Sequence, residues 1–207
     1  MAIGAAVAPV LHADRLAATL AAFFLAVGVA AHALDELVDR PLQTALTRRW
    51  LIGLAVVGLA GAVAIGVAGV LIVSPLIAPL VIVGTFLVLA YNLELAGGRF
   101  HTDTWFALAW GGFPAFTGYF ANSLSIRIEG VLVTAGCCLL SAAQRRLSTP
   151  ARELRRHTDE VVGEQHLSDG RVVALTAARL AEPLEGALSA LWMALVLLAV
   201  GLVALRL

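Results

Sequence analysis

Lysine is absent from this sequence, cysteine is nearly absent, and charged residues of either sign are few. Only 14% of the 207 residues are charged, 60% are hydrophobic, and 14 arginines balance 14 acidic residues. A soluble domain is typically about 25% charged and about 45–50% apolar. This composition excludes an ordinary cytosolic globular domain, and the neutral net charge provides no basic field for binding nucleic acid.

The two cysteines, Cys137 and Cys138, are adjacent and lie inside an apolar run. Neither a metal site nor a disulfide framework uses this spacing, so we interpret both as small apolar residues of a helix. The first residues, Met1 to Ala13, are apolar but lack the positively charged start of a secretory signal. We expect this segment to be a tail or the remnant of a further helix rather than a cleaved peptide.

Long hydrophobic runs, by contrast, are abundant. A helix that crosses a bilayer needs about 20 mostly apolar residues, and the alternating pattern of strands is absent. The sequence predicts an all-α fold, a polytopic bundle of about six transmembrane helices in a single integral-membrane domain over residues 1–207. The six predicted spans are Leu16–Leu34, Leu51–Val73, Leu76–Ala96, Thr104–Ala121, Gly130–Leu147 and Gly186–Leu205.

The arginines are distributed unevenly around these spans. Eleven of the 14 follow the first, third and fifth spans, whereas Arg15, Arg127 and Arg206 fall on the other side. Cytoplasmic loops of membrane proteins carry the excess of positive charge. We therefore expect a protein of the plasma membrane whose loops after the first, third and fifth spans are cytoplasmic, with both termini outside.

Residues 148–185 form the longest predicted segment outside the membrane. Thr149-Pro150 is typical of a helix start, because proline is favoured at the first helical position, and Gly163 is a suitable stop. Asp169-Gly170 predicts a turn, and Val172–Leu180 predicts a short amphipathic helix at the membrane interface. The expectation is a cytoplasmic loop with short helices.

The first polar cluster lies at the end of the first span. His32, Asp35, Glu36 and Asp39 follow the i, i+3, i+4, i+7 spacing of one helical stripe. Carboxylates one turn apart at the mouth of a bundle suit Mg²⁺, which also takes water and phosphate oxygens. This predicts Asp35 and Asp39 as metal ligands and the stripe as catalytic. The alternative is a solvated helix end with a Glu36–Arg40 ion pair, in which His32 is a neutral, hydrogen-bonded residue.

The second cluster joins the third and fourth spans around Gly97-Gly98. Arg99 and His101 could bind phosphate, whereas Asn92 or Glu94 could hold a metal or a proton. The alternative is an ordinary helix–loop–helix connection in which the helix dipole favours an acidic residue near the start of the fourth span. The candidate substrate-binding residues of this cluster are Tyr91, Asn92, Glu94, Arg99, His101 and Asp103.

The third cluster, Gln144 to Glu160, contains five arginines. Guanidinium groups match phosphate oxygens, but the positive-inside rule alone would also place arginines here. We therefore assign a substrate-binding role to Arg145 and Arg146, nearest the membrane, and treat the other arginines as topological. Asp159 and Glu160 are weaker acidic candidates.

The order and spacing of these clusters, over Leu16 to Gln165, resemble the UbiA-type intramembrane prenyltransferase superfamily. That family has an Asn-Asp-x-x-Asp-x-x-x-Asp type motif at one helix end, where this chain has AHALDELVDRPL. It then has a Tyr-Pro-x-x-Lys-Arg type motif, where this chain has Tyr91-Asn92-Leu93-Glu94 followed by Arg99. The family's second aspartate motif has no counterpart here, since Gln144-Arg145-Arg146 stands at that place, and the family has about nine helices.

The resemblance implies a divergent, shortened relative that binds an isoprenoid diphosphate through Mg²⁺ at a cytoplasm-facing cavity. It also implies prenyl transfer or cyclisation, with Arg40, Arg99 and Arg145 neutralising the diphosphate. One alternative is a non-enzymatic membrane protein that binds a lipid or a partner. Another is a CAAX-type intramembrane protease, since Asp35-Glu36-x-x-x-Arg40 approximates its Glu-Glu-x-x-x-Arg signature, although no Phe-x-x-x-His motif follows.

Overall fold

The computed structural model describes residues 1–38 and 44–207, and the described chain is mostly helical. In chain order the elements are α1 (Ala2–Ala6), α2 (Ala13–Phe23), the π-helix η1 (Phe24–Ala31), α3 (His32–Val38), α4 (Arg48–Ile72), the 3₁₀-helix η2 (Pro75–Ile77), α5 (Ala78–Asn92), α6 (Leu95–Gly98), α7 (Asp103–Phe106), the π-helix η3 (Ala107–Gly112), α8 (Phe113–Ser123), α9 (Ile128–Arg156), β1 (Glu164–His166), β2 (Val172–Ala174) and α10 (Ala177–Ala204).

All six segments predicted as spans are helical. Four helical runs of the described chain are long and apolar enough to cross a membrane: Ala13–Val38, Arg48–Ile72, Pro75–Asn92 and Ala177–Ala204. The prediction of an all-α, membrane-type helical fold is therefore confirmed at this level. The segments 104–121 and 130–147 also lie in helices, within α7 to α8 and within α9. That these two cross the bilayer as well, giving six spans, stays a prediction.

Two stretches of π-helix interrupt the bundle, and glycine lets each of them pack closely on a neighbour. A Cβ at Gly58 of α4 would lie 2.7 Å from the carbonyl oxygen of Leu25 in η1. A Cβ at Gly111 of η3 would lie 2.5 Å from the carbonyl oxygen of Cys137 in α9. Only a residue without Cβ allows these backbones to approach so closely. π-helical turns are rare and are frequently found at functional sites.

The helix α9 runs through Pro150 without a break, from Ile128 to Arg156. The predicted helix start at Thr149-Pro150 is therefore wrong. Proline removes one backbone hydrogen bond, but α9 packs along α10, and this packing supports the helix on both sides of the proline. Beyond Pro150, Arg155 donates two hydrogen bonds of 2.7 and 2.6 Å to the Glu185 carboxylate of α10.

Residues 164–174 form a β-hairpin in place of the predicted short helices. Strands β1 and β2 pair antiparallel, with Gln165 opposite Val173, and α10 begins only at Ala177, where the Thr176 hydroxyl accepts a hydrogen bond from the N–H of Arg179. The predicted amphipathic helix Val172–Leu180 is therefore wrong. The β-branched pair Val172-Val173 favours a strand, and the Asp169-Gly170 turn lets the chain fold back on itself.

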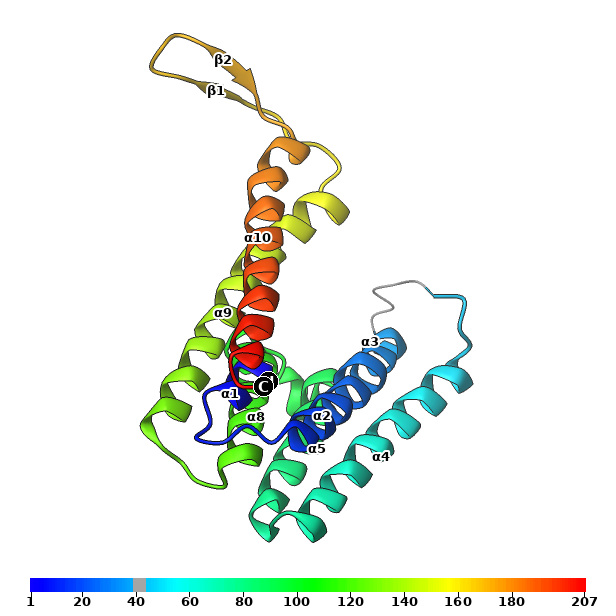
Figure 1. The fold of residues 1–207 in the computed structure, drawn as a ribbon. Helices are drawn as coiled ribbons and strands as arrows, with labels where there is room; N and C mark the ends of the chain where they lie inside the picture. The colour runs from blue at the N-terminus through cyan, green and yellow to red at the C-terminus, as the bar shows by residue number, and fades with distance from the viewer. Residues whose placement is uncertain (39–43) are drawn as a thin grey trace.

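Figure 1 shows the resulting arrangement, in which α9 and α10 lie side by side and extend beyond the other helices to the β-hairpin. The helices α2 to α5 form the other part of the bundle. At the start of the chain, α1 packs against α8 with Gly4, Ala5 and Ala6 buried. Of the two expectations for this segment, a tail or the remnant of a further helix, the structure shows a short helix packed on the bundle.

Candidate functional site

Tyr91, in the last turn of α5, lies at the centre of an aromatic cluster. Its ring stacks on His101 with 4.4 Å between the ring centroids, and it meets the edge of Trp110 at 5.4 Å and Phe106 at 6.1 Å. The chain returns to Tyr91 through a tight turn in which Glu94, Ala96, Gly97 and Gly98 all have positive φ. This turn places His101 Nδ1 3.1 Å from the Tyr91 carbonyl oxygen.

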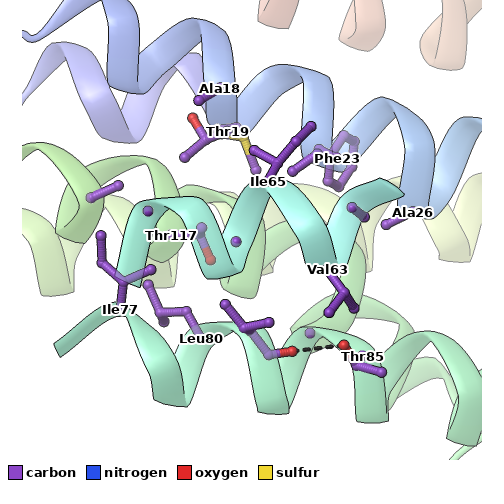
Figure 2. A pocket seen from close by; sticks show the side chains of 18 of the residues that line it. Ala18, Thr19, Phe23, Ala26, Val63, Ile65, Ile77, Leu80, Thr85 and Thr117 are labelled. Atoms are coloured by element: carbon purple, nitrogen blue, oxygen red, sulfur yellow. Dashed lines mark hydrogen bonds between the residues drawn. The ribbon is translucent and has the colours of Figure 1, made fainter. Parts of the chain in front are cut away.

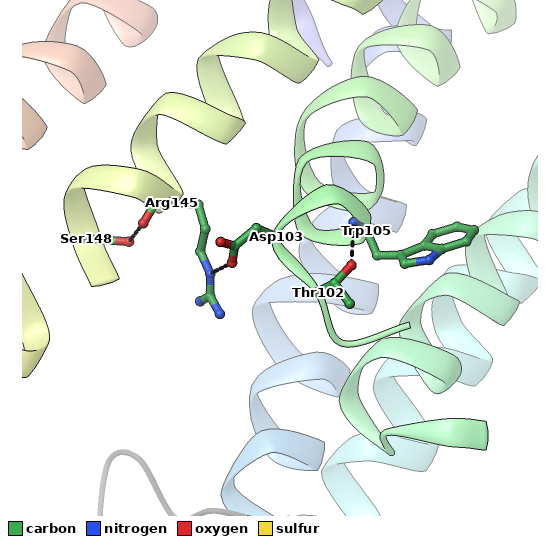
Figure 3. Close-up of polar contacts among 5 residues, drawn as sticks. All are labelled: Thr102, Asp103, Trp105, Arg145 and Ser148. Atoms are coloured by element: carbon green, nitrogen blue, oxygen red, sulfur yellow. Dashed lines mark hydrogen bonds and ion pairs between the residues drawn. The ribbon is translucent and has the colours of Figure 1, made fainter. Parts of the chain in front are cut away.

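Arg145 of α9 reaches the same cluster from the other side. Its Nε donates a hydrogen bond of 2.9 Å to Asp103 Oδ1, as Figure 3 shows, and its guanidinium carbon lies 5.1 Å from the centroid of the Phe106 ring. The Arg145 side chain is only 19% exposed. Carboxylate and ring hold the guanidinium in one position, and its remaining N–H groups are donors for an anion.

Ring contacts and an ion pair connect Tyr91 to residues of two predicted clusters. Tyr91 contacts Phe106 of α7, whose ring lies near the guanidinium of Arg145 in α9, and Arg145 pairs with Asp103 of α7. The fold therefore brings Tyr91, His101 and Asp103 of the second cluster together with Arg145 of the third.

Glu36, on the same predicted stripe as Asp35, is buried in the protein. It is 2% exposed, and its Oε1 accepts hydrogen bonds from the backbone N–H of Thr44 at 2.7 Å and from the Thr44 hydroxyl at 3.1 Å. His32 is exposed, with Nδ1 2.6 Å from the carbonyl oxygen of Val27. The predicted stripe thus divides into an exposed His32, a half-buried Asp35 and a buried Glu36. Asp39 and Arg40 lie outside the described residues.

The remaining predicted site residues differ in their surroundings. Asn92 is buried and donates from Nδ2 to the carbonyl oxygen of Val88 at 2.6 Å, so its side chain is occupied within its own helix. Glu94 is exposed, with its carboxylate 3.8 Å from His101 Nδ1. Arg99 and Arg146 are exposed. Asp159 and Glu160 are exposed too, and follow the end of α9.

An apolar cavity of about 370 Å³ lies inside the bundle, and Trp110 of this aromatic cluster is among its lining residues. Val88, Ile77 and Arg15 also line it. Figure 2 shows side chains from the surrounding helices directed into it, most of them aliphatic. Because Trp110 lines the cavity and also contacts Tyr91, the polar and apolar parts adjoin each other.

A second hollow of about 350 Å³ lies at the surface along α9. Its lining residues are Arg145, Thr149, Arg152, Glu153 and His157. The sequence predicted a topological role for Arg152, because the positive-inside rule accounts for arginines there and only Arg145 and Arg146 lie nearest the predicted span. The spacing 145, 149, 152 is a helical i, i+4, i+7 pattern, and would have revealed this face if the helix had been expected to continue.

Within residues 1–38 and 44–207, no group of three or more His, Cys, Asp or Glu side chains could hold a metal ion. Asp35 is the described member of the predicted Mg²⁺ pair. The arrangement can bind an anion at a fixed guanidinium beside an aromatic ring, with an apolar chain extending into the bundle. No family model, curated protein or solved structure matches this chain. Membership of the UbiA-type superfamily therefore stays a prediction.

Proposed function

We propose that this protein binds an isoprenoid diphosphate, or a related phosphorylated lipid, inside a membrane. The observation that carries the proposal is one aromatic cluster with two neighbours: the guanidinium of Arg145 lies over Phe106, which contacts Tyr91, and Tyr91 contacts Trp110, which lines the apolar cavity. An amphiphile with a phosphate head and a hydrocarbon tail satisfies both at once. Binding sites of this volume typically combine an apolar wall with a few polar groups.

The head of the ligand would lie at Arg145. Guanidinium groups bind phosphate through two parallel hydrogen bonds, and such charge-assisted bonds are about twice as strong as neutral ones. Asp103 and Phe106 already hold this guanidinium, so the entropy lost on binding is small. In a prenyl transfer, charge developing on a departing diphosphate would be stabilised by the same group.

The tail of the ligand would lie in the cavity. Residues 77 and 88 both line it, and at 1.5 Å per helical residue they lie about 16 Å apart. An extended amino-acid residue has three backbone bonds and spans about 3.5 Å. An isoprene unit adds four chain bonds, so by the same ratio its extended length is about 5 Å. The cavity therefore favours a chain of about three isoprene units, which makes farnesyl diphosphate a suitable probe.

Mg²⁺ is the metal that this proposal includes, because it neutralises diphosphate charge when bound. Asp35 fits as one ligand by its chemistry, since it is a half-buried carboxylate in α3 and Mg²⁺ takes carboxylate oxygens. Its predicted partner, Asp39, lies outside the described residues. We also propose a plasma-membrane location with this site on the cytoplasmic side, as the arginine distribution favours.

The test is isothermal titration of the purified protein in lipid nanodiscs with farnesyl diphosphate, with and without Mg²⁺. We expect Arg145→Gln to weaken binding by about 10- to 100-fold, as expected for a lost hydrogen bond to a charged group. The control is Arg146→Gln, on the same helix but exposed. Thermal unfolding of each variant excludes misfolding. Absence of binding to wild type, or equal binding by the two variants, would overturn the proposal.

The same titration tests the metal through Asp35→Asn. We expect Mg²⁺ to strengthen binding to the wild type but not to this variant. Binding that never depends on Mg²⁺ would eliminate the metal while leaving the anion site. Incubation with a radiolabelled probe then separates an enzyme from a non-enzymatic lipid-binding protein, because only the enzyme releases diphosphate from the prenyl chain.

A further inference from the structure

Three threonines line the apolar cavity, and one of them has an unsatisfied hydroxyl. The Thr19 hydroxyl donates to the carbonyl oxygen of Leu16 at 2.9 Å, within α2. The Thr85 hydroxyl donates to the carbonyl oxygen of Val81 at 2.8 Å, within α5. The Thr117 hydroxyl of α8 is buried and, among the described residues, has no hydrogen-bond partner. Figure 2 shows Thr117 among the side chains around the cavity. A buried hydroxyl without a partner is costly, so Thr117 favours a ligand that carries an acceptor.

Arg15, in the first turn of α2, lines the same cavity. Its Nη1 donates a hydrogen bond of 3.2 Å to the carbonyl oxygen of Ala121, which lines the cavity one turn beyond Thr117 on α8. This bond uses one of the five N–H donors of the half-buried guanidinium. Asp14 also lines the cavity, but adjacent helical residues do not face each other. In the described part of the chain no carboxylate pairs with Arg15, so its charge favours an anionic ligand.

Arg15 and Thr117 are well separated from Arg145. Asp103, which binds Arg145, and Ala121, which binds Arg15, belong to one continuous helical run formed by α7, η3 and α8. At 1.5 Å per residue, these two positions lie about 27 Å apart along that run. The pair Arg15 and Thr117 is therefore a polar site distinct from the one at Arg145.

The lining of the cavity also indicates the length of the ligand. Along α2 and η1 the lining residues extend from Arg15 to Val27, about 18 Å at 1.5 Å per residue. An extended chain covers about 1.2 Å per bond, scaled from about 3.5 Å for three backbone bonds. About 15 chain bonds therefore match this length, which makes palmitate, with its unbranched tail, a suitable probe.

We propose that the cavity binds a long-chain fatty acid whose carboxylate lies at Arg15 and Thr117. The guanidinium neutralises the carboxylate and donates to it, and the Thr117 hydroxyl donates to one of its oxygens. The tail lies among the apolar side chains of the cavity. This combination of an apolar wall and a few placed polar groups is typical of a ligand pocket. The inference goes beyond the proposed function, since it requires neither a phosphate nor Arg145.

The experiment measures the binding of radiolabelled palmitate and methyl palmitate to the purified full-length protein in detergent. The ester keeps the carbonyl oxygen but lacks the charge, so the wild type should bind palmitate about tenfold more tightly, as a hydrogen bond to a charged group implies. Arg15→Gln should remove this preference. Thr117→Val should weaken binding of both probes about 3- to 10-fold. It should also leave the Tm unchanged or raise it, because the hydroxyl that it removes has no partner in the described protein.

Two matched controls test whether the effects belong to this site. The Thr134 hydroxyl is also buried without a partner among the described residues, but Thr134 does not line the cavity. Arg127, before the first turn of α9, is exposed. Thr134→Val and Arg127→Gln should each leave both affinities within a factor of two.

The outcomes that would overturn this inference differ from those that would overturn the proposed function. Equal affinity of the wild type for acid and ester, or unchanged binding in Thr117→Val, would mean that the chain only partitions as a membrane lipid does. These two results decide the question even if Arg15→Gln, which loses its bond to α8, fails to fold. Palmitate binding without farnesyl diphosphate binding would overturn the proposed function alone, and the reverse would overturn this inference alone.

Discussion

Thr44 donates both its backbone N–H and its hydroxyl to the buried carboxylate of Glu36. These bonds hold the chain against the end of α3, at the residue where the described structure resumes. Burying a carboxylate is costly unless hydrogen-bond donors satisfy it. The Glu36–Thr44 hydrogen bonds therefore stabilise the folded protein, whether or not Glu36 also acts in catalysis. The sequence placed Glu36 on a catalytic stripe, and it could not indicate this partner eight residues away.

We expect Thr44→Val to lower the free energy of unfolding by about 1 kcal/mol, the usual net value of one hydrogen bond. The matched control is Thr47→Val, since the Thr47 side chain makes no capping hydrogen bond at the start of α4. The measurement is thermal unfolding in detergent. An equal loss of stability in both variants would mean that the Glu36–Thr44 contact contributes nothing.

Asp169 in the β-hairpin turn gives a pH-dependent prediction. The backbone N–H of Arg171 at 3.1 Å, followed by its guanidinium Nε at 2.7 Å, lowers the pKa of the Asp169 carboxyl below its ordinary value. A group whose pKa is lowered on folding stabilises the folded state above its unfolded pKa, and this stabilisation is lost as the pH falls through the folded pKa. The turn should therefore remain intact at neutral pH and loosen in acid.

The measurement is an NMR titration of the Asp169 carboxyl carbon in the detergent-solubilised protein. We expect Arg171→Gln to raise the pKa of Asp169 toward its ordinary value, because the guanidinium is lost while the backbone N–H stays. Arg179→Gln, a change of the same kind farther along the chain, should leave that pKa unaltered. An unaltered pKa in Arg171→Gln would contradict the assigned cause.

At the scale of elements, the close packing of η3 on α9 determines the position of Arg145. A Cβ at Gly111 would lie 2.5 Å from both the carbonyl oxygen of Cys137 and the Cβ of Ser141. Neither is the end of a flexible side chain, so the two helices would have to separate. Arg145 lies one turn beyond Ser141, and any separation of α9 from η3 would shift it away from Phe106.

We expect Gly111→Ala to destabilise the protein by about 1–3 kcal/mol, as overpacking typically does, and to weaken farnesyl diphosphate binding. The control is Gly136→Ala in α9, where an added Cβ meets nothing within 4 Å. That change should be neutral or should stabilise the helix by up to about 1 kcal/mol. Unfolding and titration of both variants test this, and a wild-type-like Gly111→Ala would contradict the packing argument.

At the scale of the whole molecule, the two ends of the chain lie close together. Arg206 Nη2 donates to the carbonyl oxygens of Ala8 at 2.9 Å and Pro9 at 2.8 Å. Neighbouring ends fit an even number of membrane crossings, which both four and six spans provide. With six spans, the connection between α8 and α9 and the β-hairpin lie on opposite sides of the membrane. With four spans, they lie on the same side.

Cysteine labelling separates these cases. In a background with Cys137 and Cys138 replaced by alanine, Ser168→Cys marks the β-hairpin and Ile126→Cys marks the α8–α9 connection. With six spans, a membrane-impermeant maleimide should reach Ile126→Cys from outside intact cells and Ser168→Cys only in inside-out vesicles. If α7 to α9 do not cross the bilayer, both positions react from the same side, which would overturn the six-span prediction.

The sequence by itself determined where the helices lie, because hydropathy and helical propensity act locally along the chain. Each of the six predicted segments lies mainly in helix, but α9 continues nine residues beyond the predicted Leu147 and α10 begins nine residues before the predicted Gly186. Local rules failed at Pro150 and at Val172–Leu180. At Pro150, the packing of α9 on α10 outweighs the one backbone hydrogen bond that proline removes. At Val172, a turn followed by β-branched residues favours a hairpin over a helix.

Only the tertiary structure decided which polar side chains share a site. Tyr91, Asp103 and Arg145 lie on three different helices, and their meeting around Phe106 depends on how those helices pack. The sequence could name all three as candidates, but it could not show that Asp103 holds Arg145 whereas Arg146 is exposed. The spacing of charges is a local property, whereas the direction in which a helix face points is set by its neighbours in space.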